Sequence, residues 1–426
     1  MNCKRRVKQV IIAVVAVLLL LPIHKVSAQE LPANYHNDLQ LDAKAAIAID
    51  SQSGQLLYGK NINQPLPIAS MTKLVTAYLT LQAIQRKKIT WQTKITPTPA
   101  IVKVAGNRDF SNVPLKAGHS YTVKQLYQAT LIESANGAAM LLAEAVSGSQ
   151  QAFVRQMREQ LRKWQITDAK IYTTCGLPNK SVGSDAYPNA DPDAENQMSA
   201  RDMAIVGQRL LQDFPDVVQT TTIARRDFVD QNQRYPMTNF NWMLKGLPQY
   251  QPQLKVDGLK TGTTDAAGAC FIATAKHEGA RVITVVLGAA HKSPTDPARF
   301  VQTSHLLQYL YQNYRPLIFK PNEVITGLTK MKVKNGKQKQ VNLGMKSASA
   351  IWLPVNGPKL QVELVNSSVE APIKRGQIIN AYQFKVGKQK LLSVQNPTGL
   401  RMPASSLQAT DKVNIFVRFW RWLFGE

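Results

Sequence analysis

The chain has 426 residues, of which 44% are hydrophobic and 19% are charged. This ordinary composition excludes gross disorder, and the length predicts two or three domains. The net charge of +25 predicts attraction to polyanions. Nucleic acid is not the expected partner, because the basic residues are not interleaved with aromatic ones and the N-terminus directs the chain out of the cytoplasm.

Residues 1–28 have the pattern of a signal peptide. Positive charges precede an apolar run from Val10 to Leu21, which is too short for a comfortable membrane span, and small residues follow at Val26–Ala28. We therefore expect an exported chain that begins at Gln29. A retained anchor helix is the alternative.

Two cysteines remain after such a cleavage, Cys175 and Cys270. Two cysteines cannot form the scaffold of so long a chain, and their apolar or turn surroundings predict free thiols. No cysteine or histidine cluster has the spacing of metal ligands. We therefore expect neither a metal nor a cofactor.

Residues Ala45–Lys60 predict a β-hairpin, because two apolar runs flank a turn at Ser51–Gly54. The next segment, Leu66–Thr80, predicts an amphipathic helix. It carries Ser70 and Lys73 three residues apart, so that both side chains lie on one helical face.

The middle of the chain is predicted to be helical. Thr122 can cap a helix over residues 123–132, and another helix is predicted from about Ala138. A polar loop over residues 179–196 follows, then a hairpin over 269–289 and a helix over 302–314. These elements predict an α+β (α/β) domain, an antiparallel sheet flanked by helices, over residues 29–318.

The character of the chain changes after this domain. Short alternating runs separated by turn residues predict a small all-β domain over residues 319–403, and "KMKVKNGKQKQ" is its densest charge run. A solvated hairpin or edge strand explains that run, and contact with an anionic wall or membrane is the alternative. Residues 404–426 predict an amphipathic helix, because Asn414, Arg418 and Arg421 form a narrow polar stripe beside aromatic bulk.

Three short strings occur in a fixed order: S-x-x-K at Ser70–Lys73, S-x-N at Ser134–Asn136, and K-T-G at Lys260–Gly262. Together they resemble the penicillin-recognising serine enzymes. The segments "IASMTKL", "ESANGAAMLLAEAVSG" and "VDGLKTGTTDAAGACFIATA" more closely resemble the low-molecular-mass penicillin-binding proteins, which are serine-type D-alanyl-D-alanine carboxypeptidases. The resemblance implies a β-lactamase/transpeptidase-like fold over about residues 45–314, and a β-rich second domain and amphipathic anchor also suit this family.

A serine hydroxyl is a weak nucleophile until a neighbour takes its proton, and a neutral Lys73 can do so. Burial and the cation of Lys260 would lower the pKa of Lys73. The resemblance implies that the backbone N–H groups of Ser70 and Thr263 stabilise the oxyanion. Thr263 stands where relatives often carry a larger side chain.

The resemblance also assigns the remaining candidate residues. It implies that Ser134 relays a proton to the leaving D-alanine and that Asn136 binds the substrate's peptide group. Lys260 and Thr261 would hold the terminal carboxylate, with Arg299 as a possible second cation or, alternatively, a surface ion-pair residue. Gly262 would let the ligand approach the strand.

The expected substrates are peptidoglycan stem peptides, and β-lactams are expected to acylate the enzyme. The expected location is the outer face of the bacterial cytoplasmic membrane, reached through the C-terminal helix. A class A-like β-lactamase is one alternative, but it needs a glutamate-bearing loop, and the nearest candidate, Glu195, is followed by "NQM". A non-catalytic wall-binding or penicillin-sensing protein is the other alternative.

Overall fold

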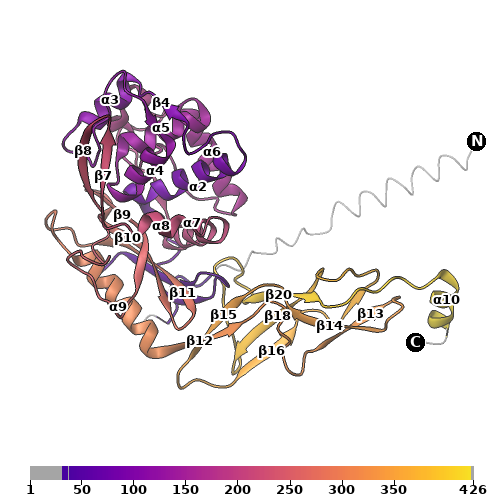
Figure 1. Ribbon diagram of the computed structural model, residues 1–426. Helices are drawn as coiled ribbons and strands as arrows, with labels where there is room; N and C mark the ends of the chain where they lie inside the picture. Colours follow the sequence, from indigo (N-terminus) through magenta and orange to yellow (C-terminus); the bar gives the residue numbers. More distant parts are fainter. Residues whose placement is uncertain (1–30, 37, 424–426) are drawn as a thin grey trace, which may run out of the picture. The chain divides into compact units, whose positions relative to one another are not determined.

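The structure is a computed structural model that describes residues 31–36 and 38–423. The predicted signal peptide lies outside the described residues. Figure 1 shows the helices and strands in their order along the chain.

The central sheet of the first domain has five antiparallel strands in the order β2-β1-β11-β10-β9. They are β1 (Ala45–Asp50), β2 (Leu56–Lys60), β9 (Val256–Thr264), β10 (Gly268–His277) and β11 (Ala280–Ala289). Both predicted hairpins are present, and the antiparallel sheet is confirmed. Strand β9 lies at the end of the order and pairs only with β10 among the described strands.

Each face of this sheet packs against helices, because successive strand residues point to opposite faces. Ile47 and Ile49 of β1 belong to one hydrophobic core, whereas Ala46 and Ala48 belong to another. The first core contains residues of α2 (Lys73–Gln85), α3 (Pro99–Gly106), α4 (Val123–Ile132), α5 (Asn136–Ser147), α6 (Gln150–Lys163), α7 (Ala200–Asp213) and α8 (Val217–Thr221). The second core contains residues of α9 (Ala298–Asn313), which Figure 1 shows on the other side of the sheet.

The predicted amphipathic helix over Leu66–Thr80 is wrong in two respects. The segment begins with the short strand β3 (Leu66–Pro67) and the 3₁₀ turn η1 (Ala69–Thr72), and α2 begins only at Lys73. Residues 73–80 are all buried, because helices α4 to α7 surround α2. The hydroxyl of Thr76 donates to the backbone oxygen of Thr174 at 2.6 Å, which satisfies a polar group inside this core.

The other helix boundaries follow their local chemistry. The predicted cap at Thr122 is confirmed, since its hydroxyl accepts from the Gln125 N–H and the Gln125 side chain accepts from the Thr122 N–H. Helix α9 begins at Ala298, four residues before the predicted start. The Asp296 carboxylate accepts the Ala298 N–H at 2.9 Å and so satisfies a donor at the start of the helix.

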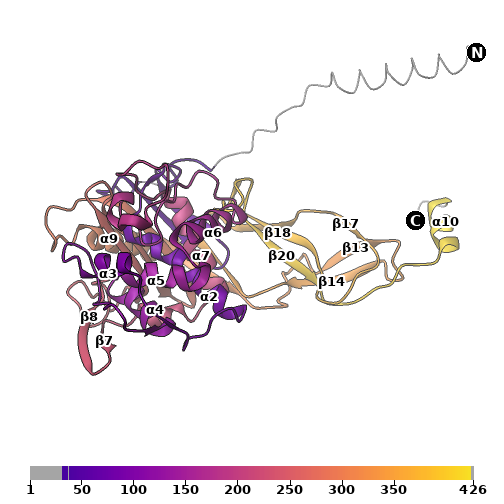
Figure 2. The same cartoon turned by 90° about the horizontal axis from the view of Figure 1, so that it is seen from above.

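The second domain is all-β, as predicted, and Figure 2 shows its strands lying together. Strand β12 (Tyr314–Phe319) pairs with β15 (Ser349–Pro354). A seven-stranded sheet has the order β16-β18-β20-β14-β13-β17, with β19 beside β18. Its strands are β13 (Lys330–Lys334), β14 (Gln340–Met345), β16 (Leu360–Leu364), β17 (Ser368–Glu370), β18 (Ile378–Val386), β19 (Gln389–Lys390) and β20 (Arg401–Ser406).

Six short elements complete the description of the first domain. They are η2 (Asn179–Asp185), β6 (Gln197–Met198), which pairs with β3, the pair β4 (Lys94–Ile95) and β5 (Tyr121–Thr122), and the hairpin β7 (Arg225–Asp230) and β8 (Gln233–Thr238). At the other end of the chain, the helix predicted over residues 404–426 is shorter in the structure: residues 404–406 belong to β20, and helix α10 (Ile415–Leu423) begins only at Ile415. Within the part of the chain that the structure describes, no helix has the length and apolar character needed to cross a membrane.

Candidate active site

Ser70 lies in the turn η1, immediately before α2, and other parts of the chain approach this turn closely. A Cβ atom added to Gly176 would lie 2.0 Å from the Ala69 backbone oxygen, and one added to Gly262 would lie 2.6 Å from the Ile68 oxygen. The Ala69 backbone itself has φ +46°, a left-handed conformation that is uncommon outside glycine. The absent Cβ of Gly262 therefore makes room for the turn that carries Ser70, which is a different partner from the ligand predicted there.

Lys73 is the first residue of α2 and is fully buried. Its Nζ lies 2.8 Å from the Ser70 Oγ, 2.8 Å from the Asn136 Oδ1 and 2.6 Å from the Cys175 backbone oxygen. A neutral amine has two N–H donors and one lone pair. The Asn136 and Cys175 oxygens can take the two donors, which leaves the lone pair for the Ser70 hydroxyl proton.

The S-x-N string lies between α4 and α5. Ser134 is buried and has φ +58°, and no described residue forms a hydrogen bond with its hydroxyl. Asn136 begins α5; its side-chain amide donates to the Ser111 backbone oxygen at 3.0 Å while its oxygen contacts Lys73. The structure thus gives Asn136 a contact with the lysine, in addition to the predicted role toward the substrate.

The K-T-G string lies on β9, whose free edge leaves backbone groups available to a ligand. Lys260 is buried, and its Nζ donates to the Thr261 backbone oxygen at 3.0 Å. Thr261 is also buried, whereas Thr263 is exposed. The string therefore places a buried cation beside the edge strand, close to where Gly262 meets the Ser70 turn.

Arg299 lies in the first turn of α9 and is buried rather than exposed. Its Nη1 donates to the Gly262 backbone oxygen at 2.8 Å and to the Cys270 backbone oxygen at 3.2 Å. Its Nη2 donates to the Thr263 hydroxyl at 2.7 Å. This guanidinium binds the end of β9 to β10, and its burial rules out the surface ion pair that the sequence also allowed.

Burial dominates the electrostatics of the two lysines. Desolvation lowers the pKa of Lys73 to about 8. It lowers the pKa of Lys260 well below its usual value, and the nearby charges of Lys73 and Arg299 lower it further. Two ammonium ions in one buried cluster disfavour each other, so proton binding at the two lysines is coupled.

The 179–196 loop reaches the site at its end. Asn196 is fully buried and donates to the Thr72 hydroxyl at 3.0 Å, which ties the loop to the turn that carries Ser70. Next to it, the Glu195 carboxylate accepts the Thr264 hydroxyl at 2.7 Å, at the end of β9. Burial raises the pKa of Glu195, and the neighbouring Asp265 raises it further.

Sequence reasoning missed several groups that complete the cluster. The Cys175 and Ser111 contributions are backbone carbonyls, and Gly176 contributes only the absence of a side chain. No motif can reveal a carbonyl, since every residue has one. The cysteine thiols themselves are buried and unpaired in the structure, as predicted.

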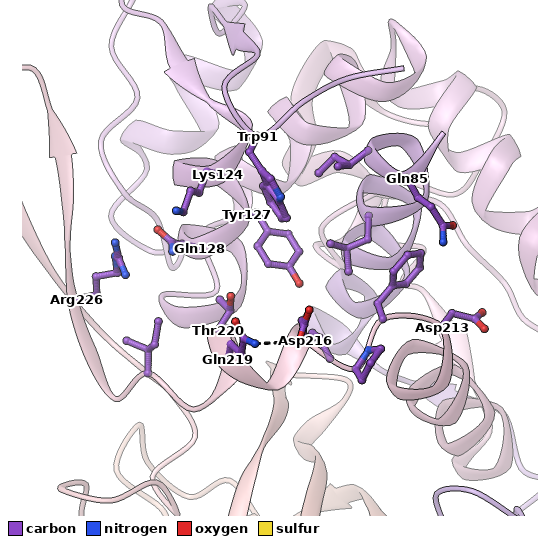
Figure 3. Close-up of a pocket in the computed structure, with 16 residues that line it drawn as sticks. Gln85, Trp91, Lys124, Tyr127, Gln128, Asp213, Asp216, Gln219, Thr220 and Arg226 are labelled. Atoms are coloured by element: carbon purple, nitrogen blue, oxygen red, sulfur yellow. Dashed lines mark hydrogen bonds between the residues drawn. The ribbon is translucent and has the colours of Figure 1, made fainter. Parts of the chain in front are cut away.

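A cavity lies elsewhere in the first domain, at the C-terminal end of α2 and the N-terminal half of α4 (Figure 3). It has a volume of about 630 Å³ and a mixed lining that includes Trp91, Tyr127, Asp216 and Arg226. None of the candidate site residues lines it, and it contains no serine beside a lysine. Among the described residues, no group of three or more His, Cys, Asp or Glu side chains could hold a metal ion.

Comparison with known proteins matches both domains. The family described as D-alanyl-D-alanine carboxypeptidase (peptidase S11) matches residues 31–291, and the one described as the C-terminal domain of penicillin-binding protein 5 matches residues 315–410. The D-alanyl-D-alanine carboxypeptidase DacC of Escherichia coli is 31% identical over 89% of this chain and 87% of its own length.

Solved structures of penicillin-binding proteins are also similar to this chain. A peptidoglycan synthesis regulatory factor (PBP3) from Streptococcus pneumoniae is 33% identical, with a TM-score of 0.73, over 87% of this chain and 99% of that one. Penicillin-binding protein D2 from Listeria monocytogenes, in its cefotaxime-bound form, is 28% identical, with a TM-score of 0.52, over 64% of this chain and 98% of that one.

Proposed function

The chain belongs to the D-alanyl-D-alanine carboxypeptidase family of serine peptidases, and we propose that it removes the terminal D-alanine of peptidoglycan stem pentapeptides through an acyl-enzyme on Ser70. The observation that carries this proposal is the 2.8 Å contact between the Lys73 Nζ and the Ser70 Oγ inside a buried cluster. A serine beside a buried lysine with a lowered pKa is a nucleophile beside a usable base.

Acylation begins when the Ser70 oxygen attacks the carbonyl carbon between the two D-alanines and its proton passes to Lys73. The carbonyl oxygen becomes an oxyanion, which the N–H groups of Ser70 and Thr263 stabilise. As the C–N bond breaks, the leaving D-alanine amine takes a proton, which Ser134 relays. Water then attacks the ester on Ser70, which releases the shortened peptide and restores the serine.

The negative charge of the substrate's terminal carboxylate determines which of the two lysines, Lys73 or Lys260, carries a proton. Lys260 and Thr261 bind this carboxylate, and the anion favours the protonated form of Lys260. A protonated Lys260 in turn favours a neutral Lys73, because two buried cations repel each other. Substrate binding thus prepares the base for its task.

We assign Arg299 as a positioning residue rather than as a second carboxylate ligand. Its donors already bind Gly262, Thr263 and Cys270. The Thr263 N–H must point at the developing oxyanion. Arg299 fixes this end of β9 in place, and so it assists the reaction although it does not contact the substrate.

Penicillins are proposed to acylate Ser70 in the same way, and the cefotaxime-bound relative supports this. The β-lactamase alternative has less support, since the Glu195 carboxylate is bonded to Thr264 instead of standing free to activate water. The penicillin-sensing alternative does not explain why the Ser70 hydroxyl lies beside the Lys73 amine, because a binding protein needs no activated nucleophile.

We place the enzyme at the outer face of the cytoplasmic membrane, bound through its tail. The side chains of Ile415, Phe416, Phe419 and Trp420 in α10 are between 61% and 81% exposed. Such a surface on a short helix suits the membrane interface, where arginines add attraction to anionic lipid.

One experiment tests the reaction. The chain is incubated with a wall pentapeptide, and mass spectrometry follows the loss of one D-alanine, with Ser70→Ala as the control. Slow, Ser70-dependent labelling by fluorescent penicillin supports the carboxypeptidase. Rapid turnover of the drug would favour the β-lactamase, and an intact pentapeptide with no labelling would favour the sensor.

A further inference from the structure

The charge run of the second domain forms an ordered row on strand β13. Lys330, Lys332 and Lys334 are exposed, whereas Met331 and Val333 between them are buried in the domain core. Alternation along a strand places the three ammonium groups on one face, with about 6.7 Å between successive positions. The row is therefore straight and evenly spaced.

The neighbours of the row do not neutralise it. Lys330 faces Asn342 and Lys332 faces Gln340 on β14, while Ser368 of β17 lies on the other side of Lys332. None of the three row lysines forms an ion pair with another residue of the described chain. The strand neighbours of Lys330 and Lys332 are thus neutral, so the like charges of the row repel one another, and a bound anion would relieve this repulsion.

One acidic residue lies in register with the row, Glu370 beside Lys334. Its carboxylate accepts from the Asn335 side chain at 2.8 Å and lies 3.7 Å from the Lys412 Nζ. This carboxylate, at the end of the row, therefore interacts with the turn after β13 and with the start of the tail.

Protection of a sheet edge does not explain the row. Lysines on an edge strand discourage pairing with other chains, but β13 lies between β14 and β17 and has partners on both sides. The predicted solvated hairpin is confirmed, because β13 pairs antiparallel with the next strand, β14, whereas the edge-strand alternative is wrong for β13.

We propose that the row of Lys330, Lys332 and Lys334 binds a linear polyanion with regularly repeated phosphates, lying along β13. Charge complementarity and the straight, even spacing support a chain-like partner. A flat anionic membrane would match a broad basic patch instead, and the row is flanked by neutral Asn342, Gln340 and Ser368 and, beside Lys334, by the acidic Glu370. This surface is independent of the catalytic cleft and adds a way to hold the enzyme near a phosphate-bearing polymer outside the cell.

The test compares two triple variants of the mature chain from Gln29. The row variant is Lys330→Gln/Lys332→Gln/Lys334→Gln. The matched control is Lys359→Gln/Lys388→Gln/Lys390→Gln, which removes the same charge from exposed positions of the same domain. The probe is poly(glycerol phosphate), with binding measured as a function of salt concentration.

We expect the row variant to bind the polymer roughly tenfold or more weakly than the control at about 0.1 M salt, with a salt slope lower by about 2. The control should match the unmodified chain. Equal weakening in both variants would overturn the proposal in favour of general charge attraction, and no weakening in the row variant would leave the lysines as a solvated face.

A second probe separates the two anionic partners. Vesicles that contain phosphatidylglycerol should bind both variants equally, because the tail is intact in each. If the row variant bound vesicles more weakly than the control but bound the polymer equally well, the proposal would be overturned in favour of the membrane. Penicillin labelling of Ser70 should be unchanged in both variants, which checks folding and keeps this test separate from that of the reaction.

Discussion

The lysines of the catalytic cleft and those of the all-β domain differ in their exposure to solvent. Lys73 and Lys260 are buried, hydrogen bonded and lowered in pKa. The lysines of β13 alternate with core residues and project into water. Burying an ammonium costs desolvation free energy. The two lysines of the cleft carry this cost, whereas the solvated lysines of the second domain do not. The two buried lysines belong to the proposed reaction, and the exposed lysines of β13 belong to the proposed binding of a polyanion.

The sharpest test of this contrast is Ser70→Ala, which removes the nucleophile. D-alanine release and penicillin labelling should both be abolished, since no other described serine contacts Lys73. The unfolding temperature should change little, because the hydroxyl adds few atoms to the core. Mass spectrometry of the penicillin adduct measures the effect, and an adduct on the variant would remove Ser70 from the mechanism.

Lys73→Arg should lower acylation by roughly 10²-fold or more, because arginine stays charged and cannot accept the proton. Lys73→Ala should be similarly impaired. A variant with arginine that acylates near the unmodified rate would show that Lys73 acts only through its charge.

The pH dependence gives a separate test of the same residue. Lys73 works as a base only when neutral, and its pKa is about 8. The neutral fraction of Lys73 grows as pH rises, but carboxylate binding also needs a proton on Lys260, so kcat/KM for penicillin acylation should rise as the lysine pair loses its first proton and fall as it loses its second. A rate that stays constant between about pH 5 and 10 would contradict this pair of lysines as base and carboxylate ligand.

Arg299→Gln should have an intermediate effect of roughly tenfold on kcat, by loosening the strand that carries the Thr263 N–H. Two matched acyl donors distinguish its role: a D-alanyl-D-alanine peptide and the same peptide with its terminal carboxylate amidated. A positioning residue lowers kcat for both. If only the KM of the carboxylate-bearing donor rises, Arg299 binds the carboxylate directly.

The smallest effect on chemistry is expected from the tail. Truncation after Asn414 removes α10 but keeps the hydrogen bond from the Val413 N–H to the Asn335 oxygen. The enzyme should move to the soluble fraction while hydrolysis of a small D-alanyl-D-alanine peptide continues. Sedimentation with membranes at high salt measures the change. Continued sedimentation would locate the anchor elsewhere.

The sequence by itself determined much of this protein. The three strings in order indicated the family and the candidate site residues. Alternating runs predicted the all-β domain, and Thr122 with Gln125 determined a helix start. Such signals are local, because caps and periodicities depend on residues a few positions apart.

Only the tertiary structure decided how the site is held. Lys73 contacts the Cys175 carbonyl, 102 residues away, and Arg299 reaches Gly262 across 37 residues. Residues 73–80 of α2 are buried on every side, although the helix's own pattern predicted one solvent face. These features arise where segments that are far apart in the sequence contact each other in the folded chain. A carbonyl, a missing Cβ or a covering helix has no periodicity of its own, so the sequence around Ser70 could name the reactive groups but not the contacts that bury them and position them for reaction.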